Sequence, residues 1–182
     1  MASQLTKTQQ EFQDTLAECR TLFAKKLHDY GPSWRILRPS SLTDQLFIKA
    51  KRIRSLEITG ESLVGEGIRS EFIALINYSI VGLIQLERGF VDSVDMTADE
   101  ALALYDRYAK QAYELMLKKN HDYGEAWRDM RTSSYTDLIL TKIERIKEIE
   151  NLGGATLVSE GIDSNYMDIM NYAVFGAIKL HE

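Results

Sequence analysis

KKLHDYGPSWRILRPSSLTDQLFIKAKRIRSLE, residues 25–57, is the stretch that decides the fold, because the chain contains it twice. It aligns without a gap with KKNHDYGEAWRDMRTSSYTDLILTKIERIKEIE, residues 118–150, and about half of the positions are identical. After one inserted residue the match resumes, with LVGEGIRSEFIALINYSIVGLIQL over LVSEGIDSNYMDIMNYAVFGAIKL. Such an internal repeat indicates a tandem duplication. We predict repeat 1 at residues 1–92 and repeat 2 at residues 93–182, packed as one globular unit.

Each repeat is predicted to contain three α-helices. Apolar residues recur at helical spacings in the first helix of each repeat, namely Phe12, Leu16, Cys19 and Phe23, and Tyr105, Ala109, Ala112 and Met116. His-Asp-Tyr-Gly is typical of the end of that helix, and Thr97 with Glu100 predicts a capping box at the start of the fourth helix. The middle helices are expected to begin at Ser41 and Ser134, and the third helices to span about residues 65–86 and 159–180.

The third helix of each repeat is apolar nearly all round, which is typical of a central helix covered on several sides. The alternation expected of β-strands is absent from the sequence. Because three short helices bury little surface alone, the two repeats are expected to pack against each other. The predicted fold is all-α: a tandem duplication of a three-helix module that forms a pseudo-twofold six-helix bundle.

Composition and charge restrict the class of protein. The single Cys19 cannot form an internal disulfide, and the sequence has neither a signal-peptide pattern nor an apolar run long enough for a membrane span. A cytoplasmic protein with no membrane partner is therefore expected. The formal net charge of -5 argues against tight binding to long nucleic acid, whose affinity depends on many Lys and Arg contacts. A nucleotide or another small phosphorylated ligand needs only a local cluster of cations. Association into a homo-oligomer stays open.

Acidic residues in the last helix are the candidate metal ligands. At about 100° per residue, three acids and one amide fall within an arc of about 140° on this largely apolar helix: Glu160, Asp163, Asp168 and Asn171. Carboxylates directed toward a bundle interior need a pairing charge or a metal, and their oxygens suit Mg²⁺ or Mn²⁺. Glu160 and Asp163 are explained equally well as acids favoured in the first turn of a helix.

Only repeat 2 offers the full acidic cluster. Repeat 1 has Arg69 and Ala74 in the places of Asp163 and Asp168. Asp137, on the preceding helix, is a further candidate metal ligand. Its place in a Ser-x-x-Asp pattern also explains it as a capping residue.

A second group of candidates follows the first helix of each repeat. The pattern Lys-Lys-x-His-Asp-Tyr-Gly-x-x-Trp-Arg-x-x-Arg combines cations that suit phosphate oxygens with rings that suit a nucleobase. The candidate nucleotide-binding residues are Lys119, His121, Tyr123, Trp127, Arg128 and Arg131 in repeat 2, and Tyr30, Trp34 and Arg35 in repeat 1. The alternative is structural, because cations complement the dipole at a helix C-terminus and a Trp after a turn is commonly part of the core.

Two basic residues three positions apart occur in each middle helix, Lys49 with Arg52 and Lys142 with Arg145. Each pair shares a helix face and is a candidate for phosphate binding, although an exposed basic helix is the commoner case.

Asn77 and Asn171 occupy matched places between apolar neighbours in the third helices. A buried Asn must be hydrogen-bonded. Asn171 is a candidate contact to the nucleotide, and the alternative is a structural polar pair that sets the helix register.

Taken together, the motifs resemble a known family. Lys-Lys-x-His-Asp-Tyr-Gly, a helix with Asp-x4-Lys-x2-Arg, then Glu-Gly-Ile-x-Ser and a helix with Asn-Tyr are similar to the nucleotide-modification-associated domain family, originally a domain of unknown function, in two tandem copies. The resemblance implies an α-helical domain linked to nucleotide or modified-base metabolism. The helical layout also resembles the all-α nucleoside triphosphate pyrophosphohydrolases, which hold Mg²⁺ with acids spaced i, i+3 on two helices. Glu160 and Asp163 match one such pair, and the partner pair is missing in strict form.

These observations leave three hypotheses. In the first, the chain is a Mg²⁺-dependent nucleoside triphosphate pyrophosphohydrolase, in which the acids of repeat 2 hold the metal and basic residues neutralise phosphate charge. In the second, it is a non-catalytic nucleotide-binding or regulatory module. In the third, it is a helical interaction scaffold whose polar core residues serve only register and capping. An exposed and unpaired Asp168 would favour the scaffold.

Overall fold

The structure, a computed structural model, describes residues 6–60, 67–153 and 161–181. These residues form six α-helices and two short 3-10 helices: α1 Lys7–Tyr30, η1 Ser33–Ile36, α2 Pro39–Thr59, α3 Ile68–Arg88, α4 Ala98–Tyr123, η2 Ala126–Asp129, α5 Thr132–Asn151 and α6 Ile162–His181. The order of the elements repeats, which confirms the predicted all-α tandem duplication. Within the described part of the chain, no helix has both the length and the hydropathy that crossing a membrane requires.

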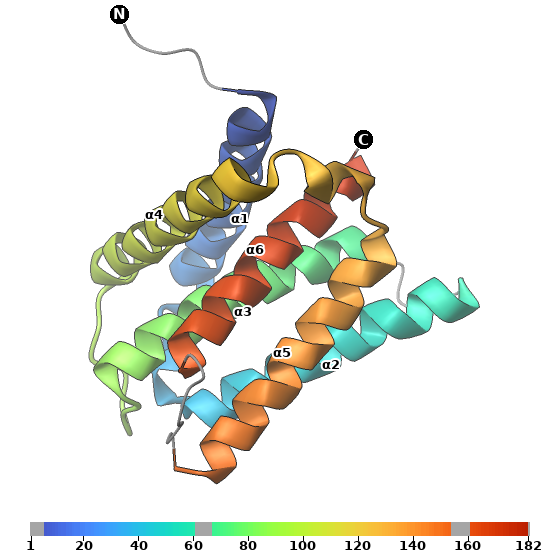
Figure 1. Cartoon of the computed structure of the whole chain (residues 1–182). Helices are drawn as coiled ribbons and strands as arrows, with labels where there is room; N and C mark the ends of the chain where they lie inside the picture. The colour runs from blue at the N-terminus through green and yellow to red at the C-terminus, as the bar shows by residue number, and fades with distance from the viewer. Residues whose placement is uncertain (1–5, 61–66, 154–160, 182) are drawn as a thin grey trace, which may run out of the picture.

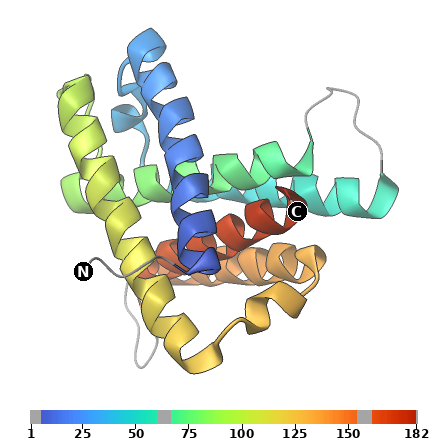
Figure 2. The same cartoon turned by 90° about the horizontal axis from the view of Figure 1, so that it is seen from above.

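The third helices of the two repeats lie side by side at the centre of the molecule. α3 packs against α6, α2 packs on α3, α5 packs on α6, and α2 contacts α5, so these helices form a group of four (Figure 1). α1 and α4 lie next to each other and cross this group at a steep angle (Figure 2). All six helices contribute residues to one hydrophobic core. Each repeat therefore buries its apolar residues partly against the other, as expected for short helical modules.

Polar contacts between α2 and α5 occur in both directions, as a twofold arrangement requires. The Thr43 hydroxyl donates to the Glu150 carboxylate at 3.3 Å, and the Thr136 hydroxyl donates to the Glu57 carboxylate at 3.1 Å. In the alignment of the repeats, Thr43 corresponds to Thr136 and Glu57 to Glu150. Reciprocal contacts of this kind characterise an interface between equivalent surfaces. They fit the predicted pseudo-twofold packing.

The ends of α1 and α4 follow the predicted signals. Gly31 and Gly124 follow these helices with φ of 64° and 62°, in the left-handed region that glycine adopts without strain. At the start of α4, Thr97 and Glu100 form the predicted capping box, with both reciprocal hydrogen bonds present.

The middle helices begin earlier than the Ser-x-x-Asp pattern predicts. α2 starts at Pro39 and α5 at Thr132, and neither helix has a side-chain cap. A proline is favoured at the first helical position, because its missing N–H would have no partner there. Ser41 and Ser134 therefore lie inside the first turn, so the capping explanation of Asp137 is wrong. The third helices start at residues 68 and 162, slightly later than predicted.

Candidate functional site

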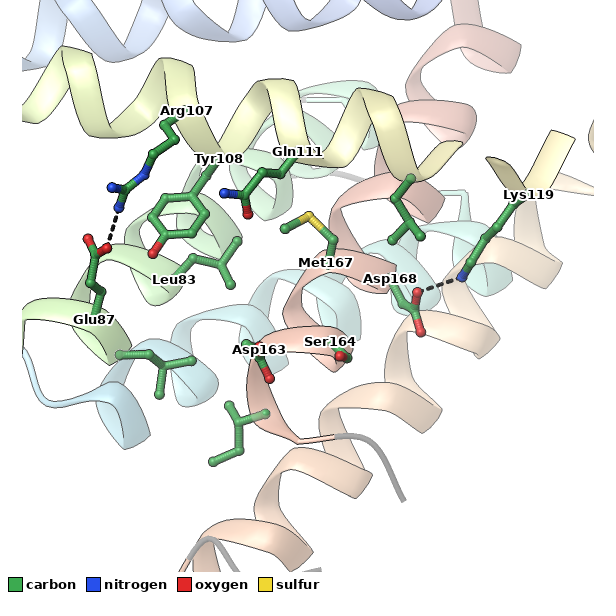
Figure 3. A pocket seen from close by; sticks show the side chains of 13 residues that line it. Leu83, Glu87, Arg107, Tyr108, Gln111, Lys119, Asp163, Ser164, Met167 and Asp168 are labelled. Atoms are coloured by element: carbon green, nitrogen blue, oxygen red, sulfur yellow. Dashed lines mark hydrogen bonds and ion pairs between the residues drawn. The ribbon is translucent and has the colours of Figure 1, made fainter. Parts of the chain in front are cut away.

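Each repeat lines a cavity, and the two cavities correspond only in part when the repeats are aligned. The repeat 1 cavity has a volume of about 620 Å³ and lies between α1, η1, α2 and α3, with walls that include Phe23, Lys26, Trp34, Lys49, Glu71 and Tyr78. The repeat 2 cavity has a volume of about 730 Å³ and lies between α3, α4 and α6, with walls that include Arg107, Tyr108, Lys119, Asp163, Met167 and Asp168 (Figure 3). Lys26 and Ser70 line the first cavity, and their counterparts Lys119 and Ser164 line the second.

The repeat 2 cavity contains a buried carboxylate whose two oxygens are both paired. Asp168 on α6 is 6% exposed. Its Oδ1 accepts a hydrogen bond from Lys119 Nζ on α4 at 2.7 Å (Figure 3). Its Oδ2 lies 3.1 Å from Lys142 Nζ on α5. A buried carboxylate is costly unless it is paired, and two ammonium groups meet this requirement. Asp168 is thus buried and paired. An exposed and unpaired Asp168 would have favoured the scaffold hypothesis.

The candidate metal ligands do not gather around Asp168 in the described part of the chain. Asp163 lines the same cavity and is exposed, whereas Asp137 is 61% exposed and pairs with Arg54 on α2 at 3.3 Å. Glu160 lies outside the described residues. Over residues 6–60, 67–153 and 161–181, no group of three or more potential ligands could hold a metal ion.

The surroundings of Asp168 also do not suit a divalent cation. Both of its oxygens contact lysine ammonium groups, which would repel Mg²⁺ or Mn²⁺ at the same oxygens. The donor set that the structure describes therefore does not fit the metal. The Mg²⁺ site stays a prediction, and no step below depends on it.

The repeat 1 cavity contains a different buried carboxylate. Glu71 on α3 is 2% exposed, and its Oε1 accepts a hydrogen bond from Arg52 Nη1 at 3.0 Å. Its Oε2 lies 3.8 Å from Lys49 Nζ, beyond hydrogen-bond distance, and has no hydrogen-bond partner among the described residues. Arg52 therefore neutralises Glu71 at close range, and the Lys49 ammonium lies at the cavity with donors to spare.

The two repeats differ in where the third helix carries its buried acid. Glu71 aligns with Asn165, and Asp168 aligns with Ala74, so the acid lies about one helical turn earlier in repeat 1. In repeat 2 the acid engages both lysines, while Arg145, the counterpart of Arg52, pairs with Glu148 at 3.1 Å. Glu71 was not among the residues predicted from the sequence. Its signal is a carboxylate near the start of a largely apolar helix whose other carboxylate, Glu87, lies at the opposite end.

The described linings of the two cavities carry opposite net charge. The described lining of the repeat 1 cavity carries Lys26 and Lys49 against Glu71, which gives +1. The described lining of the repeat 2 cavity carries two cations and three carboxylates, which gives -1: Arg107 and Lys119, with Glu87, Asp163 and Asp168. An anionic ligand is therefore favoured in repeat 1, in contrast to the sequence-based emphasis on repeat 2.

The aromatic candidates also separate between the repeats. Trp34 on η1 lines the repeat 1 cavity beside Phe23, with ring centroids 6.2 Å apart. Trp127, its counterpart, is 5% exposed and stacks on Phe175 at 4.4 Å. Phe175 aligns with Val81, whose smaller side chain lines the repeat 1 cavity. The prediction that Trp127 contacts a nucleobase is therefore corrected, because its ring is part of the core.

The candidate tyrosines lie on the surface. Tyr30 is 74% exposed and lines the repeat 1 cavity, whereas Tyr123 is 75% exposed and is not part of the repeat 2 lining. His121 and Arg131 are also exposed and lie outside that lining, and His121 contacts its neighbour Asp122. Of these four residues, only Tyr30 lines a cavity.

Two candidate arginines have structural contacts. Arg35, which is 2% exposed, donates to the Gln85 side chain and to the Gly89 carbonyl oxygen, and thereby ties η1 to the end of α3. Arg128 pairs with Glu11 at 2.5 Å and with Glu125 at 2.8 Å. Both guanidinium groups are engaged in holding elements together, and phosphate binding by Arg35 and Arg128 stays a prediction.

The matched asparagines have different surroundings. Asn77 lines the repeat 1 cavity, donates to the Cys19 carbonyl oxygen at 3.2 Å and accepts from the Tyr105 hydroxyl at 2.8 Å. Asn171 is 5% exposed, is not part of the repeat 2 lining, and its amide has no hydrogen-bond partner among the described residues. The residue that aligns with Tyr105 is Phe12, which has no hydroxyl to donate. Asn77 therefore has the hydrogen bonds that a buried asparagine requires, whereas Asn171 has none to its amide among the described residues.

Comparisons with known proteins agree with the duplication. The family model of nucleotide modification associated domain 1 matches the chain twice, over residues 26–86 and 119–180. These segments include the lysines, the buried acid and the matched asparagine of each repeat. No curated protein and no solved structure matches the chain.

Proposed function

Since the chain belongs to the family of nucleotide modification associated domain 1, in two tandem copies, we propose that it is a nucleotide-binding module and that the repeat 1 cavity is its binding site. One observation carries this proposal: Arg52 neutralises Glu71, so the Lys49 ammonium is left beside an open cavity. In repeat 2 the corresponding Lys142 is engaged by Asp168 instead.

The phosphate of the ligand would lie between Lys26 on α1 and Lys49 on α2. Both side chains line the cavity, and lysine binds phosphate as a compact point charge. Lys49 is 30% exposed, so part of its hydration is already lost before a ligand arrives, which strengthens its attraction for an anion.

The base would occupy the apolar part of the same cavity. Trp34, Tyr78 and Phe23 form an aromatic wall, and the aliphatic side chains of Leu27, Leu37 and Val81 complete it. A cavity of about 620 Å³ that is mostly apolar with a few charged groups is the usual form of a small-molecule site. Trp34 is only partly buried, so its ring is accessible to a ligand.

The proposal is the non-catalytic hypothesis. It assigns no catalytic residue, because the strongest candidate, Asp168, is held by Lys119 and Lys142. A carboxylate in this state is poorly placed to bind a metal or to accept a proton from water.

Calorimetric titration with nucleotides tests the proposal. We expect binding by the wild type, and a loss of about 10- to 100-fold in affinity for Lys49→Met, because a hydrogen bond to a charged group contributes ~1.5–3 kcal/mol. Lys51→Met is the matched control, since Lys51 is exposed on the same helix and is not part of the cavity lining. Its affinity should equal that of the wild type.

Two outcomes would overturn the proposal. Absence of binding across mono-, di- and triphosphates of all common nucleosides would remove it altogether. Release of pyrophosphate in Mg²⁺ or Mn²⁺ that is lost in Asp168→Asn would replace it with the pyrophosphohydrolase hypothesis.

A further inference from the structure

We infer that the ligand of the repeat 1 cavity is a nucleoside monophosphate, bound as its dianion without a metal ion. This inference rests on the proposed function and specifies its ligand. It follows from the number of charges that face the cavity.

The described lining has a net charge of +1, and Arg52, which pairs with Glu71 from outside the lining, brings the local balance to two positive charges for a phosphate. Lys26 and Lys49 are the cations of its described lining, and the single carboxylate, Glu71, is neutralised by Arg52 at 3.0 Å. A phosphate monoester carries a charge of about -1.5 to -2 at pH 7. Two lysines therefore balance one terminal phosphate.

Nucleoside di- and triphosphates exceed this balance. Each further phosphoryl group adds negative charge, which proteins usually neutralise with more basic side chains or with Mg²⁺ held by carboxylates. Among the residues described around the repeat 1 cavity, the only carboxylate is Glu71, and its Oε1 is committed to Arg52. The described lining thus lacks both means of holding a longer phosphate chain.

A neutral hydrogen-bond donor completes the match to a single phosphate. Ser33 on η1 lines the same cavity as the two lysines, whereas the hydroxyl of Ser70, also in the lining, already donates to the Gly67 carbonyl oxygen at 2.7 Å. A serine hydroxyl donates to a phosphate oxygen without adding charge. The polar part of the cavity is thus suited to one compact dianion, and the aromatic wall is left to the base.

Repeat 2 supplies a natural control for this argument. Its Asp168 occupies the place that a bound anion would take between the two lysines, and Ala74 leaves that place open in repeat 1. Ala74→Asp should therefore supply an internal carboxylate to Lys26 and Lys49 and compete with the phosphate.

The experiment compares the mono-, di- and triphosphates of each common nucleoside by calorimetric titration, in EDTA and again in excess Mg²⁺. We expect the monophosphate to bind about tenfold or more tightly than the triphosphate in EDTA, with no gain from Mg²⁺. A tighter triphosphate, or binding that requires Mg²⁺, would overturn the inference while leaving the proposed function intact. Absence of binding by every nucleotide would instead overturn the proposed function.

Ala74→Asp provides the second measurement. It should weaken monophosphate binding about tenfold or more while the affinity for the uncharged nucleoside stays unchanged. Ser55→Asp, which adds the same charge at an exposed position of α2, should bind the monophosphate as the wild type does. Circular dichroism melts of both variants establish that they are folded. Unchanged monophosphate affinity in folded Ala74→Asp would contradict the inference.

Discussion

Gly176 of α6 lies directly against the ring of Phe72 of α3, so closely that a Cβ added to the glycine would come within 2.9 Å of the ring carbons. The same contact occurs in the opposite direction, where a Cβ on Gly82 would come within 3.0 Å of the Tyr166 ring. Gly82 aligns with Gly176 and Phe72 with Tyr166. The central helices therefore approach each other through two equivalent pairs of a glycine and a ring.

Replacing the glycine should destabilise the protein. Gly176→Ala is expected to lower the free energy of unfolding by about 1–3 kcal/mol, because the added methyl group overpacks against Phe72. This net loss already includes the gain of about 1 kcal/mol that alanine brings to a helix interior, so the overpacking itself should cost more. Urea unfolding measures the difference, and Phe72→Leu in the Gly176→Ala background should recover part of it. An alanine variant as stable as the wild type would contradict the contact.

Giving Asn171 a partner should stabilise the core. The Tyr105 hydroxyl donates to Asn77 Oδ1 at 2.8 Å, and Phe12 occupies the aligned place beside α6. We expect Phe12→Tyr to raise the free energy of unfolding by about 0.5–1.5 kcal/mol through a hydrogen bond to the buried amide. In an Asn171→Leu background the same substitution should give no gain, which isolates the pairwise contribution. If Phe12→Tyr lowered the free energy of unfolding of the protein that retains Asn171, the new hydroxyl would not reach the amide.

Removing the acid of repeat 2 should expose its lysines to anions. In a Lys49→Met background, Asp168→Ala is expected to cost about 1–3 kcal/mol, less than a fully buried pair would, because Lys119 and Lys142 reach solvent. Millimolar inorganic phosphate should then raise the melting temperature more than chloride at equal ionic strength. Asp163→Ala in the same background removes an exposed acid of the same cavity and should give no such response to phosphate.

The stability of the interface between α2 and α5 should depend on pH. Burial raises the pKa of Glu57 and of Glu150 above the ordinary value of 4.5, although Thr136 and Thr43 donate hydrogen bonds that lower it in part. A raised pKa means that the folded state binds more protons, so the stability from these groups is complete below pH 4.5 and falls as the pH rises through the raised pKa values.

The double variant Glu57→Gln/Glu150→Gln tests this dependence. It should be more stable than the wild type at pH 7, and this advantage should shrink to nothing as the pH falls below 4.5, because both wild-type carboxyls are then protonated in the folded and unfolded states. Melting temperatures measured from pH 4 to pH 8 provide the check. An advantage that is constant with pH would have to come from packing and not from charge.

Several features of the fold could be predicted because they depend on residues close together in the chain. The spacing of Phe12, Leu16 and Phe23 indicates one buried helix face, and the glycine after His-Asp-Tyr marks a helix end. The starts of α2 and α5 were predicted two residues too late, because the Ser-x-x-Asp pattern was interpreted as a cap and neither helix has a side-chain cap. In α2 the helix begins at Pro39, which suits the first helical position.

The candidate site could be predicted only in its parts. Lys119, Lys142 and Asp168 were all candidates, but the lysines were expected to hold phosphate and the acid a metal. In the structure they pair with one another. The alignment shows that repeat 1 lacks an acid at Ala74, but not that Glu71, one turn earlier, pairs with Arg52.

The sequence by itself determined the duplication, the all-α class and the set of charged residues available to each repeat. Only the tertiary structure decided which lysines are neutralised and which of the two cavities has a net positive lining. The physical reason is distance. Helical periodicity depends on neighbours three or four residues apart, whereas an ion pair depends on a separation of a few ångströms between side chains from different helices. A shift of one acid by a single helical turn changes those separations and leaves the helical pattern intact.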